Sequence, residues 1–308
     1  MKLMKSTVNG KLKAFPIKGN GVRQDRTALI VFAIIFAIYA FVLIFPFYWI
    51  FINSLKDRTQ FAQSTWSFPT DWAFTNYRQL FELQNVKRDF DILEMFKNSL
   101  ILCLIVPTMS TISTTTAAYV MAKYKFKGRG ILFFIYLIPM IVSIASTTSA
   151  TLRLFEKLGF NNMPFVGIAF MAANGMGLGF LLIYAVFKST SNTYMEAARI
   201  DGAGHLRTFF QVMLPHAMGI IGTNWVLGFI GTWNDYITPK IFLGRDYYTI
   251  ATGLEQIHIW VTGVGEEFFI NNYPLYFAAI ILSIIPIILL LVIFQKQIMK
   301  ISLGGGIK

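Results

Sequence analysis

Long apolar segments separated by polar stretches dominate the sequence, and six of them are long enough to cross a lipid bilayer as helices. They are residues 28–52, 96–122, 131–152, 164–187, 218–242 and 274–294. None alternates apolar and polar residues as a membrane strand does, and a helix satisfies its backbone hydrogen bonds internally. The pattern therefore predicts an all-α membrane protein with six transmembrane helices.

The distribution of charge predicts how these helices are oriented. If the N-terminus is cytoplasmic, the cytoplasmic segments hold 17 of the 27 Lys and Arg residues but only 3 of the 15 Asp and Glu residues, a net charge of +14. The opposite side then carries a net charge of −2. Cytoplasmic loops collect Lys and Arg. We therefore expect a basic tail (residues 1–27) and a Gly-rich tail (residues 297–308) in the cytoplasm, flanking a transmembrane domain at residues 28–296.

Composition supports a membrane protein and weakens other classes. Only 14% of the residues are charged, whereas about a quarter are charged in a soluble domain. The net charge of +12 would suit a nucleic-acid-binding protein, but topology accounts for where the positive charges lie. The single cysteine excludes a disulfide framework. The three histidines have no spacing typical of metal ligands, so no metal site is expected.

Three connecting segments are long enough to fold. Residues 53–95, on the outer side, are rich in aromatic residues, which suits either an interfacial aromatic belt or a folded outer element. Residues 243–273, also outside, combine glycines with polar groups and predict a mobile loop that could contact a partner or ligand. The third segment, residues 190–215, faces the cytoplasm.

Two predicted spans carry runs of hydroxyl residues, "TMSTISTTTAA" from Thr108 and "SIASTTSAT" from Ser143. Small and hydroxyl side chains let membrane helices approach closely and hydrogen-bond to one another. The alternative is that these residues line a translocation path. Packing between helices is the favoured interpretation for most of them.

The third connecting segment reads as two short helices. Thr193 and Glu196 have the spacing of a capping box, which predicts a helix start, and Gly202 or Gly204 can supply a left-handed stop. Pro215 is expected to end the second helix before the fifth span. That helix has one apolar face at the helical period, formed by Leu206, Phe209, Phe210 and Met213. The pattern leaves two functions open, a helix lying in the lipid headgroups or a docking element for a cytoplasmic protein.

The same segment resembles a known motif. Glu196-Ala197-Ala198, three residues, Gly202, nine residues and Val212-x-Leu214-Pro215 resemble the EAA loop of ABC-importer permeases, with valine in place of isoleucine. The resemblance implies a coupling helix that sits in a cleft of an ATP-binding subunit. The ATPase-coupling residues it implies are Glu196, Ala197, Ala198, Asp201, Gly202, Leu214 and Pro215.

Further stretches narrow the resemblance to carbohydrate importers of the maltose type. "AAYVMAKYKFKGRG" (residues 117–130) is similar to their junction between the second and third spans. The closing "SLGGGIK" is similar to the tail of the shorter permease, which implies that Gly304, Gly305 and Gly306 contact the ATPase. The resemblance implies a type I ABC importer permease fold in a bacterial cytoplasmic membrane. The implied partners are a second permease in a heterodimer, two ATP-binding subunits and an extracytoplasmic solute-binding protein.

The chain is not expected to be an enzyme. It contains no G-x-x-x-x-G-K-[ST] loop, so no ATP or other cofactor is expected to bind to it, and the partner ATPase would use ATP and Mg²⁺. It also lacks an HExxH motif or a suitable Ser/Asp pair for intramembrane catalysis.

Candidate residues for a substrate pathway lie in the fifth predicted span. Sugar sites combine aromatic platforms with amide and carboxylate groups, and an acid near the membrane suggests function. The candidates are Asn224, Trp233, Asn234, Asp235 and Tyr236. The alternative is that Asp235 is solvated at the membrane interface and that Asn234 hydrogen-bonds to a neighbouring helix. A sugar or oligosaccharide is the expected substrate. A peptide, an anion or an acidic polysaccharide carried by the same architecture is the main alternative, and a secondary transporter is weaker because no repeat relates the two halves.

Overall fold

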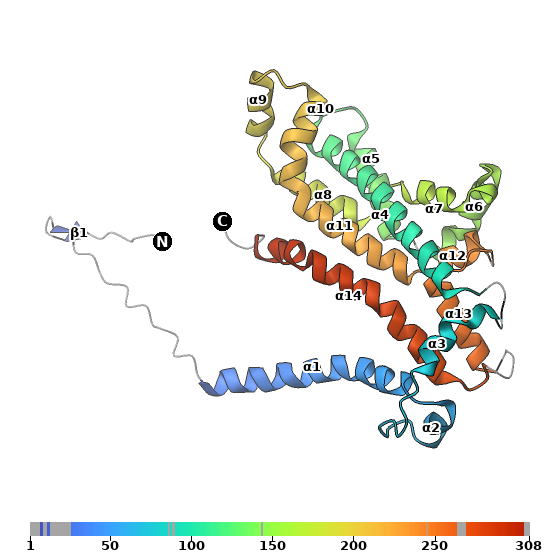
Figure 1. Ribbon diagram of the computed structural model, residues 1–308. Coiled ribbons are helices and arrows are strands. Elements are labelled where there is room, and N and C mark those ends of the chain that lie inside the picture. Colours follow the sequence, from blue (N-terminus) through green and yellow to red (C-terminus); the bar gives the residue numbers. More distant parts are fainter. Residues whose placement is uncertain are drawn as a thin grey trace. The chain divides into compact units, whose positions relative to one another are not determined.

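The structure, a computed structural model, describes residues 7–8, 11–12, 26–85, 87, 90–142, 144–244, 246–263 and 269–304 (Figure 1). By its internal contacts the chain divides into two units, Met1–Trp49 and Ile50–Lys308. Helices make up most of the described residues, in agreement with the predicted helical class.

The first unit contains a short strand pair and most of the first long helix. β1 (Thr7–Val8) and β2 (Lys11–Leu12) pair in antiparallel fashion, which the sequence did not predict. Helix α1 (Arg26–Ser54) covers the first predicted span and continues into the second unit. Apolar residues follow one another along α1 without a polar face, which is typical of a helix surrounded by lipid.

The second unit is built from helices. They are α2 (Arg58–Gln63), α3 (Thr75–Phe81), η1 (Leu83–Asn85), α4 (Ile92–Lys123), α5 (Arg129–Leu137), η2 (Ile138–Met140), α6 (Ile144–Lys157), η3 (Phe160–Asn162), α7 (Pro164–Ala172), α8 (Leu178–Ser189), α9 (Thr193–Ile200), α10 (His205–Thr208), η4 (Phe209–Met213), α11 (Leu214–Asn234), α12 (Ile237–Phe242), α13 (Ile250–Val261) and α14 (Tyr273–Gly304). Helix α4 packs against α7, α8 and α11, and α14 packs against α3, α11 and α13.

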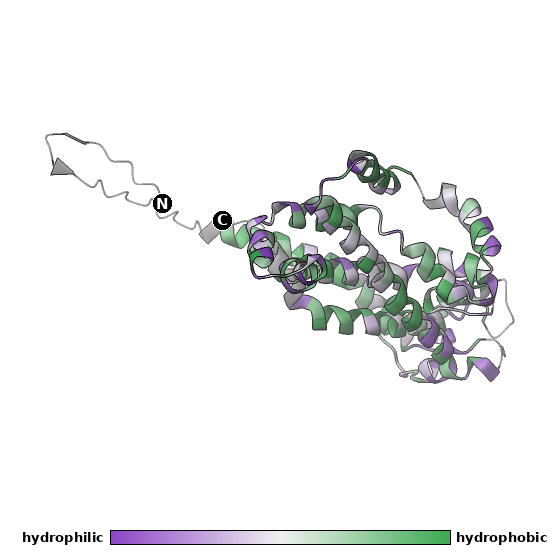
Figure 2. Ribbon diagram, turned by 90° about the horizontal axis from the view of Figure 1, so that it is seen from above, coloured by the Kyte–Doolittle hydropathy of each residue, from purple (hydrophilic) through white to green (hydrophobic). Residues whose placement is uncertain are grey.

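Among the described residues, four helices are long and apolar enough to cross a membrane. They are Leu29–Ser54, Ile92–Lys123, His205–Asn234 and Tyr273–Gln295. These helices correspond to the first, second, fifth and sixth predicted spans, and hydrophobic residues are frequent along the helices of the second unit (Figure 2).

The predicted third span, residues 131–152, is not one continuous helix. Helix α5 ends at Leu137, a 3₁₀ turn follows, and α6 begins at Ile144. Pro139 lies in the turn, and proline lacks the N–H that a continuing α-helix would use. The sequence pattern missed this break because apolar residues continue through it.

The predicted fourth span, residues 164–187, is also divided. Between α7 and α8, Gly175 and Gly177 have left-handed φ angles of 63° and 98°, which only glycine adopts at little cost. The backbone N–H of Gly177 donates to the carbonyl of Tyr136, 2.9 Å away in α5. This hydrogen bond therefore joins the break in the fourth predicted span to α5, the helix that ends at the break in the third.

The described parts of the two predicted outer segments fold more completely than their sequences suggested. Residues 250–261 form α13 rather than a mobile loop, because Thr249 and Thr252 make a capping box and Ile250 and Ile257 are buried. Residues 53–95 form α2, α3 and η1 before α4 begins. Asn76 joins this segment to the end of α1 by donating hydrogen bonds to the carbonyls of Ser54 and Lys56.

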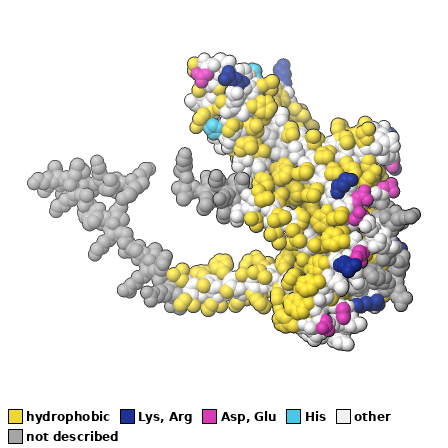
Figure 3. Space-filling view, viewed as in Figure 1, with side chains coloured by type: hydrophobic (Ala, Val, Ile, Leu, Met, Phe, Trp, Pro, Cys, Tyr) yellow, Lys and Arg dark blue, Asp and Glu magenta, His cyan; other side chains and the backbone are white. Residues whose placement is uncertain are grey.

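Two main clusters of buried side chains lie at opposite ends of the second unit. One joins α4, α11, α13 and α14 and contains Phe90, Trp233 and Phe269; we call this the α13 end. The other joins α4, α8, η4 and α9 and contains Phe187 and Met213; we call this the α9 end. Charged side chains gather at these two ends in Figure 3, with a broad hydrophobic surface between them, as expected of a membrane-spanning bundle.

Candidate functional site

The turn after α9 depends on one glycine. Gly202 has a φ angle of 78°, in the left-handed region. The N–H of Ala203 donates to the carbonyl of Ala198 at 2.8 Å, and the N–H of Gly202 donates to that of Arg199 at 3.0 Å. These two bonds form a Schellman motif, so the predicted left-handed stop is confirmed at Gly202. Gly204 has a φ angle of −70° and does not contribute one.

The predicted capping box at the start of α9 is wrong. Helix α9 starts at Thr193, and neither Asn192 nor Thr193 makes the expected side-chain cap. The hydroxyl of Ser191 instead accepts a hydrogen bond from the N–H of Thr193 at 3.2 Å. The side chain of Glu196 is exposed and does not reach back to the helix start, so it is available to a partner.

Pro215 does not end the second helix. The chain is helical without interruption from His205 to Asn234, and Pro215 lies near the start of α11. A five-residue π-helix, Phe209–Met213, precedes it, and the N–H of Leu214 bonds to the carbonyl of Phe209, five residues back. This wider turn accommodates a residue that cannot donate to the turn before it. The element after Gly202 is therefore a continuous helical extension of the fifth predicted span.

The two short helices divide their apolar residues between a buried and an exposed face. Met195 and Met213 are buried against α4 and α8 and Ala198 is also buried, whereas Glu196, Ala197 and Asp201 are exposed. Ile200 is 86% exposed and Leu206 75% exposed. The predicted apolar face is thus split, because Met213 faces the core while Leu206 and Phe210 face outward. Leu214 is half-buried and Pro215 exposed within the continuous helix.

The end of α4 holds this element from both sides. The Lys123 ammonium donates to the carbonyl of Thr190 at 2.5 Å and to the side chain of Asn192 at 2.9 Å. The Tyr124 hydroxyl and His205 Nδ1 are 2.9 Å apart and hydrogen-bonded. We call these two residues, Lys123 and Tyr124, the latch. Sequence reasoning missed their role, although both lie within the stretch "AAYVMAKYKFKGRG".

The Gly-rich tail is only partly described. Gly304 is the last residue of α14, and Gly305 and Gly306 lie outside the described residues. The implied contact between this tail and an ATPase stays a prediction.

At the α13 end, three of the four pathway candidates located there have internal hydrogen bonds. Trp233 is 3% exposed, and its indole N–H donates to the carbonyl of Ser283 at 3.1 Å. The Asp235 carboxylate accepts from the N–H groups of Ile237 and Thr238 and so starts α12. Asn234 donates to the carbonyl of Ile230, one turn earlier in the same helix. The fifth predicted span therefore ends at Asn234 rather than at Phe242.

Asn224 lies in a polar seam between α4 and α11. Its amide donates to the hydroxyl of Thr111 at 3.2 Å, and the indole N–H of Trp225 donates to the hydroxyl of Thr108 at 2.9 Å. Thr114 in turn donates to the carbonyl of Gly175 in the break between α7 and α8. The hydroxyl run from Thr108 therefore joins helices, as the packing interpretation predicted. Asn224 also lines a cavity of about 300 Å³ between α4, α8 and α11.

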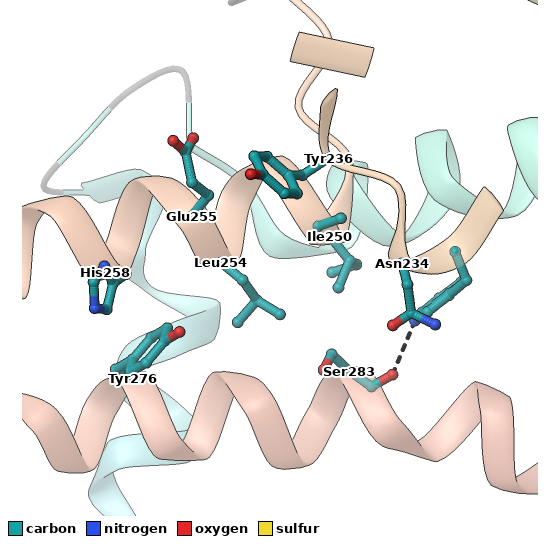
Figure 4. Close-up of a pocket in the computed structure, with 10 residues that line it drawn as sticks. Asn234, Tyr236, Ile250, Leu254, Glu255, His258, Tyr276 and Ser283 are labelled. Atoms are coloured by element: carbon teal, nitrogen blue, oxygen red, sulfur yellow. Dashed lines mark hydrogen bonds between the residues drawn. The ribbon is translucent and has the colours of Figure 1, made fainter. Parts of the chain in front are cut away.

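A second cavity, of about 320 Å³, lies between α11, α13 and α14 (Figure 4). Trp233, Asn234 and Tyr236 form one part of its wall, and Tyr236 is 44% exposed. The sequence did not indicate the rest of the wall, because it comes from helices that follow much later in the chain. Those residues are Ile250, Ala251, Leu254, Glu255, His258, Tyr276 and Ser283.

Comparisons with known proteins find sugar-transport permeases among the proteins to which this chain is similar. The chain is 25% identical over 277 residues to the diacetylchitobiose uptake system permease protein NgcG of Streptomyces coelicolor, covering 89% of this chain and 87% of that protein. It is 27% identical over 290 residues to the melibiose/raffinose/stachyose import permease protein MelC of Bacillus subtilis, covering 93% of this chain and 100% of that protein.

A solved structure and a family model cover much of the same chain. The structure is that of a bacterial ABC transporter involved in the import of the acidic polysaccharide alginate; its matching chain is 25% identical, with a TM-score of 0.74, covering 89% of this chain and 97% of that one. The family model described as "Binding-protein-dependent transport system inner membrane component" matches residues 114–300, more than half of the chain. The chain therefore belongs to this family of inner membrane components and is a multi-pass, non-catalytic ABC transporter permease.

Proposed function

We propose that this chain forms half of the translocation pathway of an ATP-driven importer for a sugar or oligosaccharide. It spans the membrane six times, with the α9 end and both termini in the cytoplasm and the α13 end outside. The broken third and fourth spans cross as paired segments. One observation carries the sugar assignment: relatives that cover 89% and 93% of this chain are named for diacetylchitobiose uptake and for melibiose, raffinose and stachyose import.

The α9 end receives the energy for transport. The exposed residues Glu196, Ala197 and Ile200 dock into a cleft of a cytoplasmic ATPase, and the Schellman turn at Gly202 fixes the angle of α9. Because the chain is helical from His205 to Asn234, movement of the docked element is transmitted along one rigid helix to the α13 end. The partners are a second permease, two ATP-binding subunits and an extracytoplasmic solute-binding protein, and the tail at Gly304, Gly305 and Gly306 reaches the ATPase.

A second substrate class, an acidic polysaccharide, is favoured by one observation. The solved transporter with a similar fold is involved in the import of alginate. Both substrate classes use the same architecture and the same coupling element, so only measurements of the substrate separate them.

Uptake by the reconstituted transporter tests the proposal. The chain is expressed with its neighbouring genes, purified in mild detergent and placed in proteoliposomes with the solute-binding protein. We expect radiolabelled neutral oligosaccharides to accumulate only when ATP is supplied on the ATPase side, and a non-hydrolysable ATP analogue serves as the control. Uptake without ATP, or a folded chain that purifies without an ATPase, would refute the assignment.

A further inference from the structure

We infer that the cavity between α11, α13 and α14 is a binding subsite for a neutral oligosaccharide, in which the side chains of Tyr236, His258 and Tyr276 contact the sugar. The inference rests on the proposed function. Membership of the family does not say which side chains contact the sugar, where the sugar binds on this chain, or whether the sugar is charged.

The cavity has the composition of a small-molecule site. Its volume of about 320 Å³ is at the lower end of the range for ligand pockets, which are mostly apolar and aromatic with a few polar groups. Tyr236 and Tyr276 supply aromatic surface from two different segments, and the buried Trp233 lies behind them in the wall. In Figure 4, Tyr236 and Glu255 lie near each other, His258 lies beside Tyr276, and Asn234 and Ser283 lie at the other end.

Some polar groups in the wall already have partners, whereas others do not. The Trp233 indole and the Asn234 amide N–H donate to backbone carbonyls. By contrast, the hydroxyls of Tyr236 and Tyr276 and the imidazole of His258 make no hydrogen bond within the described part of the chain. A tyrosine hydroxyl and a neutral imidazole can each donate and accept, as a sugar hydroxyl can. The groups without partners therefore match a polyhydroxylated ligand.

The charge of the wall favours a neutral ligand over an acidic one. Glu255 is the only acidic residue that lines the cavity, and no Lys or Arg residue lines it in the described part of the chain. The ammonium of Lys240 is already paired with the Glu255 carboxylate. Because that pair compensates the Glu255 charge, the described wall offers a uronate carboxylate no unpaired Lys or Arg, and burying a carboxylate without such a partner is costly. The cavity thus suits neutral sugars rather than an alginate-like substrate.

Protection of a single cysteine from alkylation tests the subsite. The native Cys103 is buried and is replaced by alanine as background. Ala251→Cys places a thiol in the cavity wall, and Thr262→Cys places one on an exposed position just after α13 as the matched control. The purified whole transporter is treated with a maleimide in the presence of 10 mM raffinose, maltotriose, arabinotriose or trigalacturonate. Uptake of each sugar by the reconstituted variants is measured in parallel.

We expect each neutral trisaccharide that is imported to slow labelling at position 251 by about threefold or more, with no effect at position 262. Trigalacturonate should protect neither position. Equal protection by trigalacturonate would overturn the inferred charge preference. Normal uptake of a neutral trisaccharide without protection at position 251 would overturn the subsite and leave the proposed function standing. Absence of ATP-dependent uptake of any sugar would refute the proposed function itself.

Removal of one hydroxyl tests a specific contact. Tyr276→Phe keeps the aromatic ring, so we expect the sugar concentration that gives half-maximal protection to rise about three- to tenfold, as for the loss of one hydrogen bond. Tyr273→Phe is the control, because Tyr273 is on the same helix but does not line the cavity. Equal half-maximal concentrations for Tyr276→Phe and Tyr273→Phe would remove Tyr276 from the subsite.

Discussion

The two ends of the second unit carry two candidate sites that are built in different ways. The α9 end is local in sequence where it would act: its turn and its exposed residues lie between residues 190 and 215, although α4 and α8 support it. The α13 end gathers a cavity wall from Trp233, Glu255 and Tyr276, which belong to three separate helices. A site whose geometry depends on one backbone turn can be recognised as a motif, whereas a site assembled from distant helices cannot.

The two ends also differ in whether the side chains of the candidate residues are already hydrogen-bonded within the chain. At the α9 end, the motif residues Glu196 and Ala197 are exposed and available to a partner. At the α13 end, the indole of Trp233 and the carboxylate of Asp235 are used in internal hydrogen bonds. Substitutions at the α9 end should therefore change coupling to the ATPase, and substitutions at Trp233 and Asp235 should change the stability of the fold.

The largest effect is expected at Gly202. Gly202→Val places a β-branched residue in the left-handed region, which costs at least about 1–2 kcal/mol and distorts the turn. We expect ATP-dependent uptake to fall about tenfold or more. Gly204→Val is the matched control, since Gly204 has a φ angle of −70° and a β-carbon there meets no atom within 4 Å. Equal uptake by the two variants would show that the Schellman turn does not matter for coupling.

The next effect is expected at the latch. Lys123→Met removes the hydrogen bonds to Thr190 and Asn192 while keeping a long side chain. We expect uptake to fall about three- to tenfold while ATP hydrolysis by the complex continues, because α9 still docks but is less firmly tied to α4. Lys125→Met, an exposed neighbour, serves as the control. If uptake and hydrolysis fall together in Lys123→Met, the latch supports assembly rather than coupling.

A stability effect is expected from Trp233→Phe. The substitution keeps an aromatic ring in the α13-end cluster but removes the donor to the Ser283 carbonyl, and the loss of one hydrogen bond costs about 0.5–1.5 kcal/mol. Thermal unfolding of the purified complex should begin at a lower temperature, while the relative uptake of different sugars stays the same. An altered sugar preference would instead place Trp233 in direct contact with the substrate.

The smallest effect is expected at Asp235. Asp235→Asn keeps the side-chain oxygen that caps α12, so uptake should stay within about twofold of the original. Asp235→Ala removes the cap and should lower stability by about 1 kcal/mol. Measurements of thermal unfolding and of uptake for both variants check whether Asp235→Ala has the larger effect. A large loss of uptake in Asp235→Asn would mean that the negative charge itself acts on the substrate.

The sequence predicted the helical class and the position of the left-handed stop because both depend on short-range patterns. It did not predict the break at Pro139, since apolar residues continue through it. The glycines around Asn174 marked a kink in the fourth predicted span, but the tertiary contacts that separate α7 from α8 carry no sequence signal. It assigned Pro215 as a helix stop, whereas the structure absorbs the proline in a π-helix. Glu255, His258 and Tyr276 carry no motif, and only the packing of α13 against α14 brings them together.

Co-purification of the ATPase tests the central claim, that the exposed face of α9 is the docking surface. Ile200→Glu changes a side chain that is 86% exposed, so the helices should fold and insert as before. Leu158→Glu changes an exposed apolar residue away from α9 and serves as the control. The account predicts that the tagged Leu158→Glu chain retains the ATPase in mild detergent and that the Ile200→Glu chain loses it. Full retention of the ATPase by Ile200→Glu, with uptake intact, would contradict the account.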